Sequence, residues 1–227
     1  MNSSRRNFIK KATTGAALLA APAILGSVKA SAQQNASDAV TPFKLKYAPS
    51  LGMFRQHAGQ DPIDNIKFIH DQGFRAVFDN GLMRREPALQ DKIMAELQRL
   101  KMDFGPFVLR ADSGKQDFVL KTQEVRDMLE AQMKEGVEVA KRTGAKYALI
   151  VPGRYDTKLH MDYQTANVIE NLKYCAEVCQ PEGVVIVIEP LNPWSHPGLF
   201  LTKVSQAYQI CNAVSNPACK IIDDMFH

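Results

Sequence analysis

The stretch over residues 183–192 constrains the fold more than any other part of this 227-residue chain. A run of β-branched apolar residues follows Gly183 and ends in Glu189. Such a run predicts a strand buried on both faces, as in a parallel sheet. Because Pro190 supplies no amide hydrogen to a sheet, the strand should end near Glu189. Parallel α/β folds keep their chemistry at this end of their strands, although a simple ion pair to a neighbouring Lys or Arg is the alternative for Glu189.

Residues 1–32 have the pattern of a twin-arginine signal peptide. Ser4-Arg5-Arg6-Asn7-Phe8-Ile9-Lys10 carries the paired arginines, an uncharged stretch covers residues 12–28, and Ala30-Ser31-Ala32 is a small-residue cleavage site. The uncharged stretch contains Pro22 and two glycines, so it is too weak for a stable membrane span. We expect export by the twin-arginine machinery to the periplasm. A linker should cover residues 33–42 and one domain residues 43–227.

The charge of the chain belongs mainly to this first segment. It holds five of the 28 basic residues and none of the 24 acidic ones. The remainder therefore carries 23 basic against 24 acidic side chains, a net charge of −1. A protein with that balance and only five histidines has no electrostatic footprint for nucleic acid, which argues against an endonuclease.

The four cysteines fall into two pairs. Cys175 and Cys179 share an apolar helical stripe with Val168 and Leu172, which predicts core positions. Cys211 and Cys219 have no metal-ligand spacing. An oxidising compartment would permit a disulfide among the four cysteines, although nothing in the sequence requires one.

Six predicted strands alternate with five predicted helices. The strands cover about residues 44–49, 74–78, 104–109, 147–151, 183–189 and 219–222, and the helices about 62–72, 87–101, 122–143, 163–179 and 202–214. This alternation indicates a parallel α/β protein, either a doubly wound sheet or a barrel. Ser50-Leu51-Gly52-Met53 does not supply a glycine-rich phosphate turn. We therefore favour a (β/α) barrel over a doubly wound sheet.

Polar residues directly follow five of these strands. They are Asp79, Arg110, Arg154, Glu189 and one of Asp223 and Asp224. Two carboxylates from consecutive strands, Glu189 and one of the aspartates, could share a divalent cation, with Mg²⁺ or Mn²⁺ favoured over Zn²⁺. Adjacent strand residues face opposite ways, so only one aspartate points inward, and periodicity does not choose between them.

Aromatic and histidine residues near these strand ends are weaker candidates. His227 and His196 could contact a substrate, or could be solvated loop residues. Trp194 and Phe54 could form a wall of the site, or could be ordinary packing.

Four segments carry a resemblance. They are Leu149-Ile150-Val151-Pro152-Gly153, Ile188-Glu189-Pro190-Leu191-Asn192, Pro197-Gly198-Leu199-Phe200-Leu201 and Asp224-Met225-Phe226-His227. These segments resemble the hydroxypyruvate isomerase branch of the xylose-isomerase-like sugar isomerase and epimerase barrels. The resemblance extends from about Lys44 to residue 227.

This resemblance implies a (β/α)8 TIM barrel, here truncated after about six strands, with one divalent metal. Glu189 would be a metal ligand and the acid/base, Asp224 a second ligand, and His227 would touch the substrate oxygens; we also expect Asn192 and His196 to bind the substrate. The family's reaction moves a proton between adjacent carbons of a hydroxy-carbonyl compound through an enediolate, or inverts such a carbon. We expect an isomerase acting on hydroxypyruvate or a small sugar. A sugar 3-epimerase and a non-catalytic carbohydrate-binding barrel are the alternatives.

The sequence departs from the family in two places. The family places a further Gln or His ligand and a second catalytic Glu on strands seven and eight, which this chain lacks. Pro193-Trp194-Ser195-His196 stands where relatives often carry an acidic residue. We expect the sequence to be a fragment of a longer chain; pairing with another copy as a homo-oligomer, or loss of activity, are the alternatives.

Overall fold

Helices and strands alternate along residues 40–227, the part of the chain that the computed structural model describes. The predicted signal peptide and most of the predicted linker lie outside this range. The strands are β1 (Ala76–Val77), β2 (Asp103–Phe104), β3 (Phe107–Ala111), β4 (Tyr147–Val151), β5 (Val185–Ile188) and β6 (Cys219–Ile221). The helices are α1 (Arg55–Ala58), α2 (Pro62–Asp71), α3 (Pro87–Arg99), α4 (Gln123–Thr143), α5 (Met161–Cys179) and α6 (Val204–Val214), with 3-10 turns at Leu82–Arg84 and Gln180–Glu182.

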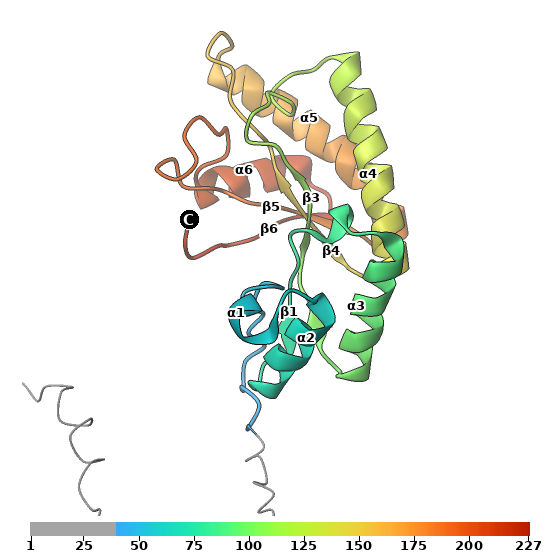
Figure 1. The fold of residues 1–227 in the computed structure, drawn as a ribbon. Coiled ribbons are helices and arrows are strands. Elements are labelled where there is room, and N and C mark those ends of the chain that lie inside the picture. Colours follow the sequence, from blue (N-terminus) through green and yellow to red (C-terminus); the bar gives the residue numbers. More distant parts are fainter. Residues whose placement is uncertain (1–39) are drawn as a thin grey trace, which may run out of the picture. The chain divides into compact units, whose positions relative to one another are not determined.

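All strand pairs are parallel, and within each sheet the strands that follow one another in the sequence are paired. β1 pairs with β2, and a second sheet has the order β3-β4-β5-β6. A doubly wound sheet would reverse its strand order partway, so the sequential order agrees with the predicted barrel architecture. Within residues 40–227 the two sheets do not close into a ring. In Figure 1, α4 and α5 cover one side of the four-stranded sheet and the C end of the chain lies on the other.

Two of the predicted strands differ from the structure. Residues 44–49 form no strand, and this part of the chain contributes only a parallel bridge between Ser50 and Phe78. The predicted strand over residues 104–109 is divided into β2 and β3, with Gly105 and Pro106 between them. Proline has no amide hydrogen to donate to a sheet, which explains the break.

The ends of the long helix α4 are set by its flanking residues. The Thr122 side chain accepts a hydrogen bond from the Val125 amide at 3.3 Å, which caps the first turn. Gly144 follows the last turn with φ of 70°, the left-handed conformation that glycine adopts without strain. These caps lie where the sequence predicts the helix boundaries.

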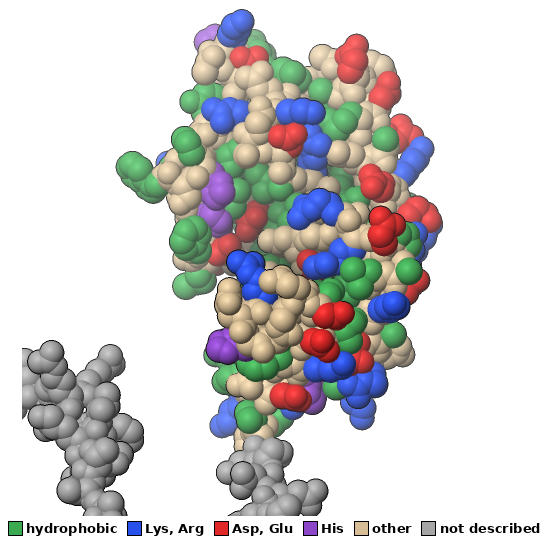
Figure 2. Space-filling model, in the orientation of Figure 1, with side chains coloured by type: hydrophobic (Ala, Val, Ile, Leu, Met, Phe, Trp, Pro, Cys, Tyr) green, Lys and Arg blue, Asp and Glu red, His purple; other side chains and the backbone are tan. Residues whose placement is uncertain are grey.

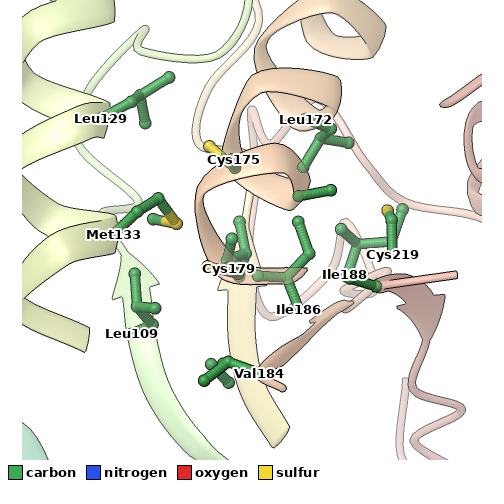
Figure 3. Close-up of a cluster of buried hydrophobic side chains, with 14 of the residues drawn as sticks. Leu109, Leu129, Met133, Leu172, Cys175, Cys179, Val184, Ile186, Ile188 and Cys219 are labelled. Carbon is green, nitrogen blue, oxygen red and sulfur yellow. The ribbon is translucent and has the colours of Figure 1, made fainter. Parts of the chain in front are cut away.

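The four-stranded sheet has two apolar faces. Alternate residues of β4, β5 and β6 pack against the helices: Ala148, Ile150, Ile186, Ile188 and Cys219. Figure 3 shows Ile186, Ile188 and Cys219 beside Leu172, Cys175 and Cys179 of α5. The intervening residues form a second cluster on the opposite, inner face: Leu149, Val151 and Val187, with Leu191 and Leu199. The alternation of side chains continues past the ends of the strands. A residue there that is in step with the inner-face residues therefore points to the same side of the sheet as this second cluster.

A further cluster surrounds β1. It contains Ile66 and Ile69 of α2, Val77 of β1, and Ile93 and Leu97 of α3. Cys175 and Cys179 are fully buried, which confirms their predicted core positions. None of the helices in residues 40–227 is both long and apolar enough to cross a membrane.

Candidate functional site

A cavity of about 500 Å³ opens at the carboxyl ends of the strands, above the inner apolar face. Its apolar lining includes Val108, Leu149, Val151 and Ile222, and its polar lining consists of Asn80, Glu189, His196, Asp223, Asp224 and His227. The described residues around it thus supply three carboxylates and no Lys or Arg. In Figure 2, histidine side chains adjoin acidic ones on the same visible face.

Strand alternation places Glu189 in this cavity. Val185 and Val187 of β5 face the inner cluster, and Glu189 continues that alternation one residue past the strand end. Its amide still donates to the Ile150 carbonyl of β4 at 3.1 Å, so the backbone at Glu189 is held in the sheet. The carboxylate is consequently half-buried at the cavity floor.

The same alternation of side chains distinguishes Asp223 from Asp224. Cys219 and Ile221 pack toward the helices, whereas Ile222 packs against the inner cluster. Asp224 lies two residues after Ile222, so its side chain points to the same inner face of the sheet. Asp223 lies between them and is exposed. The side-chain oxygen of Asp224 joins a group with Glu189 and His227. The structure thus brings Asp224, and not Asp223, to Glu189.

Three potential ligand atoms converge in the cavity. One atom each from Glu189, Asp224 and His227 lie within 4.8 Å of one another. Within this group, His227 Nε2 lies 3.8 Å from Asp224 Oδ2. The predicted pair of carboxylates is therefore assembled, together with the histidine that the sequence placed three residues later.

The surroundings of Glu189 disfavour its ionisation. Burial first, and then the negative charge of Asp224 and a hydrogen bond between the two side chains, together raise the pKa of Glu189 from 4.5 to about 7. A carboxyl group with a pKa near 7 exchanges its proton readily at neutral pH. Glu189 therefore has the property required of a general acid and base.

Asn192 determines which ring nitrogen of His227 carries the proton. The Ser195 amide donates to Asn192 Oδ1 at 2.8 Å, so the Asn192 Nδ2 group is the end that faces His227. That Nδ2 lies 3.0 Å from His227 Nδ1, and the Asn192 backbone amide donates to the same nitrogen at 3.3 Å. With two donors directed at it, Nδ1 is an acceptor, and the proton of the neutral ring is on Nε2. His227 therefore presents an N–H donor to the cavity.

His196 lines the cavity beside His227, with 5.2 Å between the ring centroids. Asn192 does not line the cavity; its side chain contacts His227 and Ser195, and its carbonyl accepts a hydrogen bond from the His196 amide at 3.1 Å. Trp194 is 92% exposed and Phe54 packs on Phe68 and Phe74, so neither forms a wall of this cavity.

The other polar residues at strand ends pair within loops. Asp79 accepts from Arg85 Nε at 2.5 Å and from the Gly81 amide at 2.9 Å. Arg110 forms an ion pair with Asp117. Arg154 donates to the Pro197 carbonyl at 3.2 Å. These three residues hold the loops in place and do not line the cavity.

Sequence reasoning missed Asn80 and Met225 as cavity residues. Asn80 follows Asp79 at the end of a predicted strand, so its position was a usable signal. Met225 is 95% exposed and has no sequence pattern that would mark it.

The residues present fit a divalent cation. Glu189 and Asp224 supply oxygen donors, and their mutual repulsion, evident in the raised pKa of Glu189, is not relieved by any basic residue in the described lining. Cations such as Mg²⁺ are commonly held by one or two carboxylates, with water and substrate completing the coordination. An Nε2–H group on His227 suits a contact to a substrate oxygen better than a metal bond.

Comparison with known protein families and curated proteins gives consistent matches. Residues 66–227 match the model of the xylose isomerase-like TIM barrel. Hydroxypyruvate isomerase of Escherichia coli (strain K12) is 29% identical over 105 residues, which cover 46% of this chain and 39% of that protein. The 2-oxo-tetronate isomerase of Cupriavidus necator is 34% identical over 62 residues, 27% of this chain and 24% of that protein. The matched segments thus span less than half the length of both relatives.

Solved structures show the same fold. An AP endonuclease, family 2, from Brucella melitensis superposes with a TM-score of 0.67 at 18% identity, covering 80% of this chain and 69% of that one. A structure of the IOLI protein with a bound zinc atom has a TM-score of 0.59 at 18% identity, covering 71% of this chain and 57% of that one.

Proposed function

Because the chain belongs to the xylose isomerase-like TIM barrel family, we propose that it is a divalent-metal-dependent isomerase of the hydroxypyruvate isomerase type. Its substrate would be hydroxypyruvate or a small sugar, in which a proton moves between adjacent carbons through an enediolate. The observation that carries the proposal is the convergence of Glu189, Asp224 and His227 in one cavity. Similarity to hydroxypyruvate and 2-oxo-tetronate isomerases supports the reaction class.

Glu189 and Asp224 are the residues that would hold the metal, with Mg²⁺ or Mn²⁺ the preferred ions. A bound zinc atom in the IOLI structure supports a divalent cation in this fold. When bound, such a cation would polarise the substrate carbonyl and stabilise negative charge on its oxygen.

The remaining chemistry is assigned to Glu189, His227 and the apolar residues of the cavity. Glu189 removes the proton from the carbon beside the carbonyl and returns it to the neighbouring carbon, for which a pKa near 7 is suited. The Nε2–H of His227 donates a hydrogen bond to a substrate oxygen as charge develops there. The apolar floor, with Leu149 and Val151, limits the access of water to the proton in transit.

Turnover measurements test this proposal directly. The protein, stripped of metal and then supplied with Mg²⁺, Mn²⁺ or Zn²⁺, is assayed for isomerisation of hydroxypyruvate and of small ketoses. Metal-dependent turnover is expected, and Glu189→Gln should reduce kcat by at least about 100-fold because it removes the acid/base group. Glu177→Gln is the matched control, since it makes the same chemical change at an exposed carboxylate of α5 that does not line the cavity.

Two results would contradict the proposal. One is the absence of turnover with every metal and substrate; metal or sugar binding without turnover would instead support a carbohydrate-binding barrel. The other is turnover that Glu189→Gln leaves unchanged.

A further inference from the structure

A pair of thiols lies on the helix-facing side of β6, away from the cavity. Cys211 is on α6 and Cys219 is the first residue of β6, and their sulfur atoms are 3.8 Å apart. Cys219 is only 2% exposed and packs in the core near Ile188, as Figure 3 shows. Cys211 is only partly buried. A disulfide requires a sulfur separation of about 2.05 Å, so the two side chains must rotate toward each other for a bond to form.

A surface depression gives access to this pair. It has a volume of about 460 Å³, and Tyr208, Cys211, Asn212, Cys219 and Lys220 are among its lining residues. A small reagent entering it meets the partly exposed Cys211 first. Cys219 lies behind, within reach of the sulfur of Cys211 but shielded from solvent.

The surroundings favour Cys211 as the reactive thiol. A hydrogen bond from the Cys219 thiol and the positive charge of Lys220 lower the pKa of Cys211. The same contact with Cys211, together with burial, raises the pKa of Cys219. Burial raises the pKa of Cys179 to about 11. Thiolates, and not thiols, attack disulfides, so the four cysteines differ sharply in expected reactivity.

We propose that Cys211 and Cys219 form a redox-active dithiol site that exchanges with low-molecular-weight disulfides such as oxidised glutathione. The Cys211 thiolate attacks one sulfur of the reagent, forms a mixed disulfide and releases one glutathione thiolate. The Cys219 sulfur, as its proton leaves, then attacks the Cys211 sulfur and releases the second glutathione. The two protein thiols lose two electrons and two protons, and one oxidised glutathione becomes two reduced ones.

The crosslink would join α6 to the strand that leads to Asp224. Asp224 lies five positions after Cys219 in the sequence. Oxidation should therefore raise the thermal unfolding temperature of the protein, because it constrains the unfolded chain between residues 211 and 219.

Peptide mapping of the full chain tests the site. The protein is equilibrated with mixtures of oxidised and reduced glutathione, its free thiols are alkylated, and it is digested with trypsin. Cys211 and Cys219 fall in one tryptic peptide, residues 204–220, and Cys175 and Cys179 fall in another, residues 174–203. We expect the first peptide to become two hydrogen atoms lighter and to lose its alkylation, and the second to stay reduced as the internal control. A first peptide that stays fully alkylated at every glutathione ratio, or equal oxidation of both peptides, would overturn the proposal.

Single variants test the order of the steps. Cys219→Ala should trap glutathione on Cys211, because no second thiol can displace it. Cys211→Ala should leave Cys219 unmodified. Glutathione bound to Cys219 in the Cys211→Ala variant at the wild-type rate would refute the assigned roles. If a variant does not fold, the wild-type peptide map still decides whether the disulfide forms.

Discussion

Glu189 illustrates at the scale of a residue how a strand end produces reactivity. The apolar strand fixes its backbone, the inner-face alternation directs its side chain over an apolar floor, and Asp224 opposes its ionisation. None of these effects requires a bound ligand. The raised pKa of Glu189 is therefore a property of the fold itself.

The raised pKa of Glu189 makes the stability of the metal-free protein pH-dependent. Because the folded-state pKa is about 7 and the ordinary value 4.5, the stabilisation from this group is complete below pH 4.5 and is lost as the pH rises through about 7. We expect the thermal unfolding temperature in the presence of a chelator to fall across this window. Glu189→Gln should remove most of this fall, and Glu177→Gln, an exposed site on α5, should leave it in place. An unchanged pH profile in Glu189→Gln would disprove the assignment.

The hydrogen bonds around Asn192 predict the tautomer of His227. In the wild type, ¹⁵N spectra of the histidine rings should show the proton of neutral His227 on Nε2. Asn192→Asp replaces the nearer, side-chain donor facing Nδ1 with a charged acceptor and leaves only the backbone amide at 3.3 Å, so the proton should shift toward Nδ1. The Ser195 amide can still donate to the new carboxylate, which preserves the loop. An Nδ1-protonated ring in the wild type would show that the donor role of His227 is wrong.

At the scale of elements, the loop after β4 depends on a close backbone approach. Gly153 has φ of 82°, and a Cβ there would lie 2.6 Å from the Lys115 carbonyl oxygen. Gly144, after α4, has φ of 70° but no atom within 4 Å of such a Cβ.

Alanine substitutions should separate these two effects. Gly144→Ala should cost only the left-handed strain, about 1–2 kcal/mol of unfolding free energy. Gly153→Ala should cost about 1–3 kcal/mol more, since it adds a backbone collision to the same strain. Urea unfolding of both variants measures the difference. Equal losses would mean that the Lys115 loop moves aside without cost.

Local signals predicted the helices and central strands well. Thr122 and Gly144 mark the ends of α4, and β4 has the bounds expected from its apolar run. The first predicted strand failed because an apolar pattern over residues 44–49 does not guarantee a pairing partner, and only Ser50 reaches Phe78. Whether such a segment becomes a strand depends on its pairing with residues that are distant in the sequence.

Strand alternation and the family resemblance together predicted the part of the candidate site that contains Glu189 and Asp224. Glu189 and Asp224 converge as expected. Asp79, Arg110 and Arg154 looked equivalent to Glu189 in the sequence, yet each found a partner in a loop, such as Asp117 for Arg110. The partner of a polar residue at a strand end depends on the conformation of the neighbouring loops. No local sequence pattern encodes that conformation.

For the whole molecule, the parallel strands follow their order in the sequence, so each βα unit adds to the one before it. The site is assembled between the ends of two such units, β5 and β6. Metal binding at Glu189 and Asp224 should consequently stabilise the pairing of β5 with β6, and with it the entire sheet.

This coupling predicts a metal-dependent stability. At a free Mn²⁺ concentration about 100 times the Kd, the unfolding free energy should rise by about 2.7 kcal/mol. Asp224→Asn should abolish the rise, whereas Asp223→Asn should retain it. At one fixed Mn²⁺ concentration, the rise should be larger at pH 8 than at pH 5.5, because a proton must leave Glu189 before the metal binds. Scanning calorimetry with and without chelator measures it, and an identical response in both aspartate variants would argue against the site.

The contacts of Arg154 constrain how the sequence of this protein can change in evolution. Its guanidinium contacts the carbonyls of Ser113 and Pro197 and lies against Gly198, so the segments after three successive strands share one side chain. A change in any of these segments alters the fit of the other two. Mutations that retune selectivity at this end of the protein should therefore accumulate in concert, and exchanging a single segment between homologues should fail unless the residues that receive Arg154 are transplanted with it.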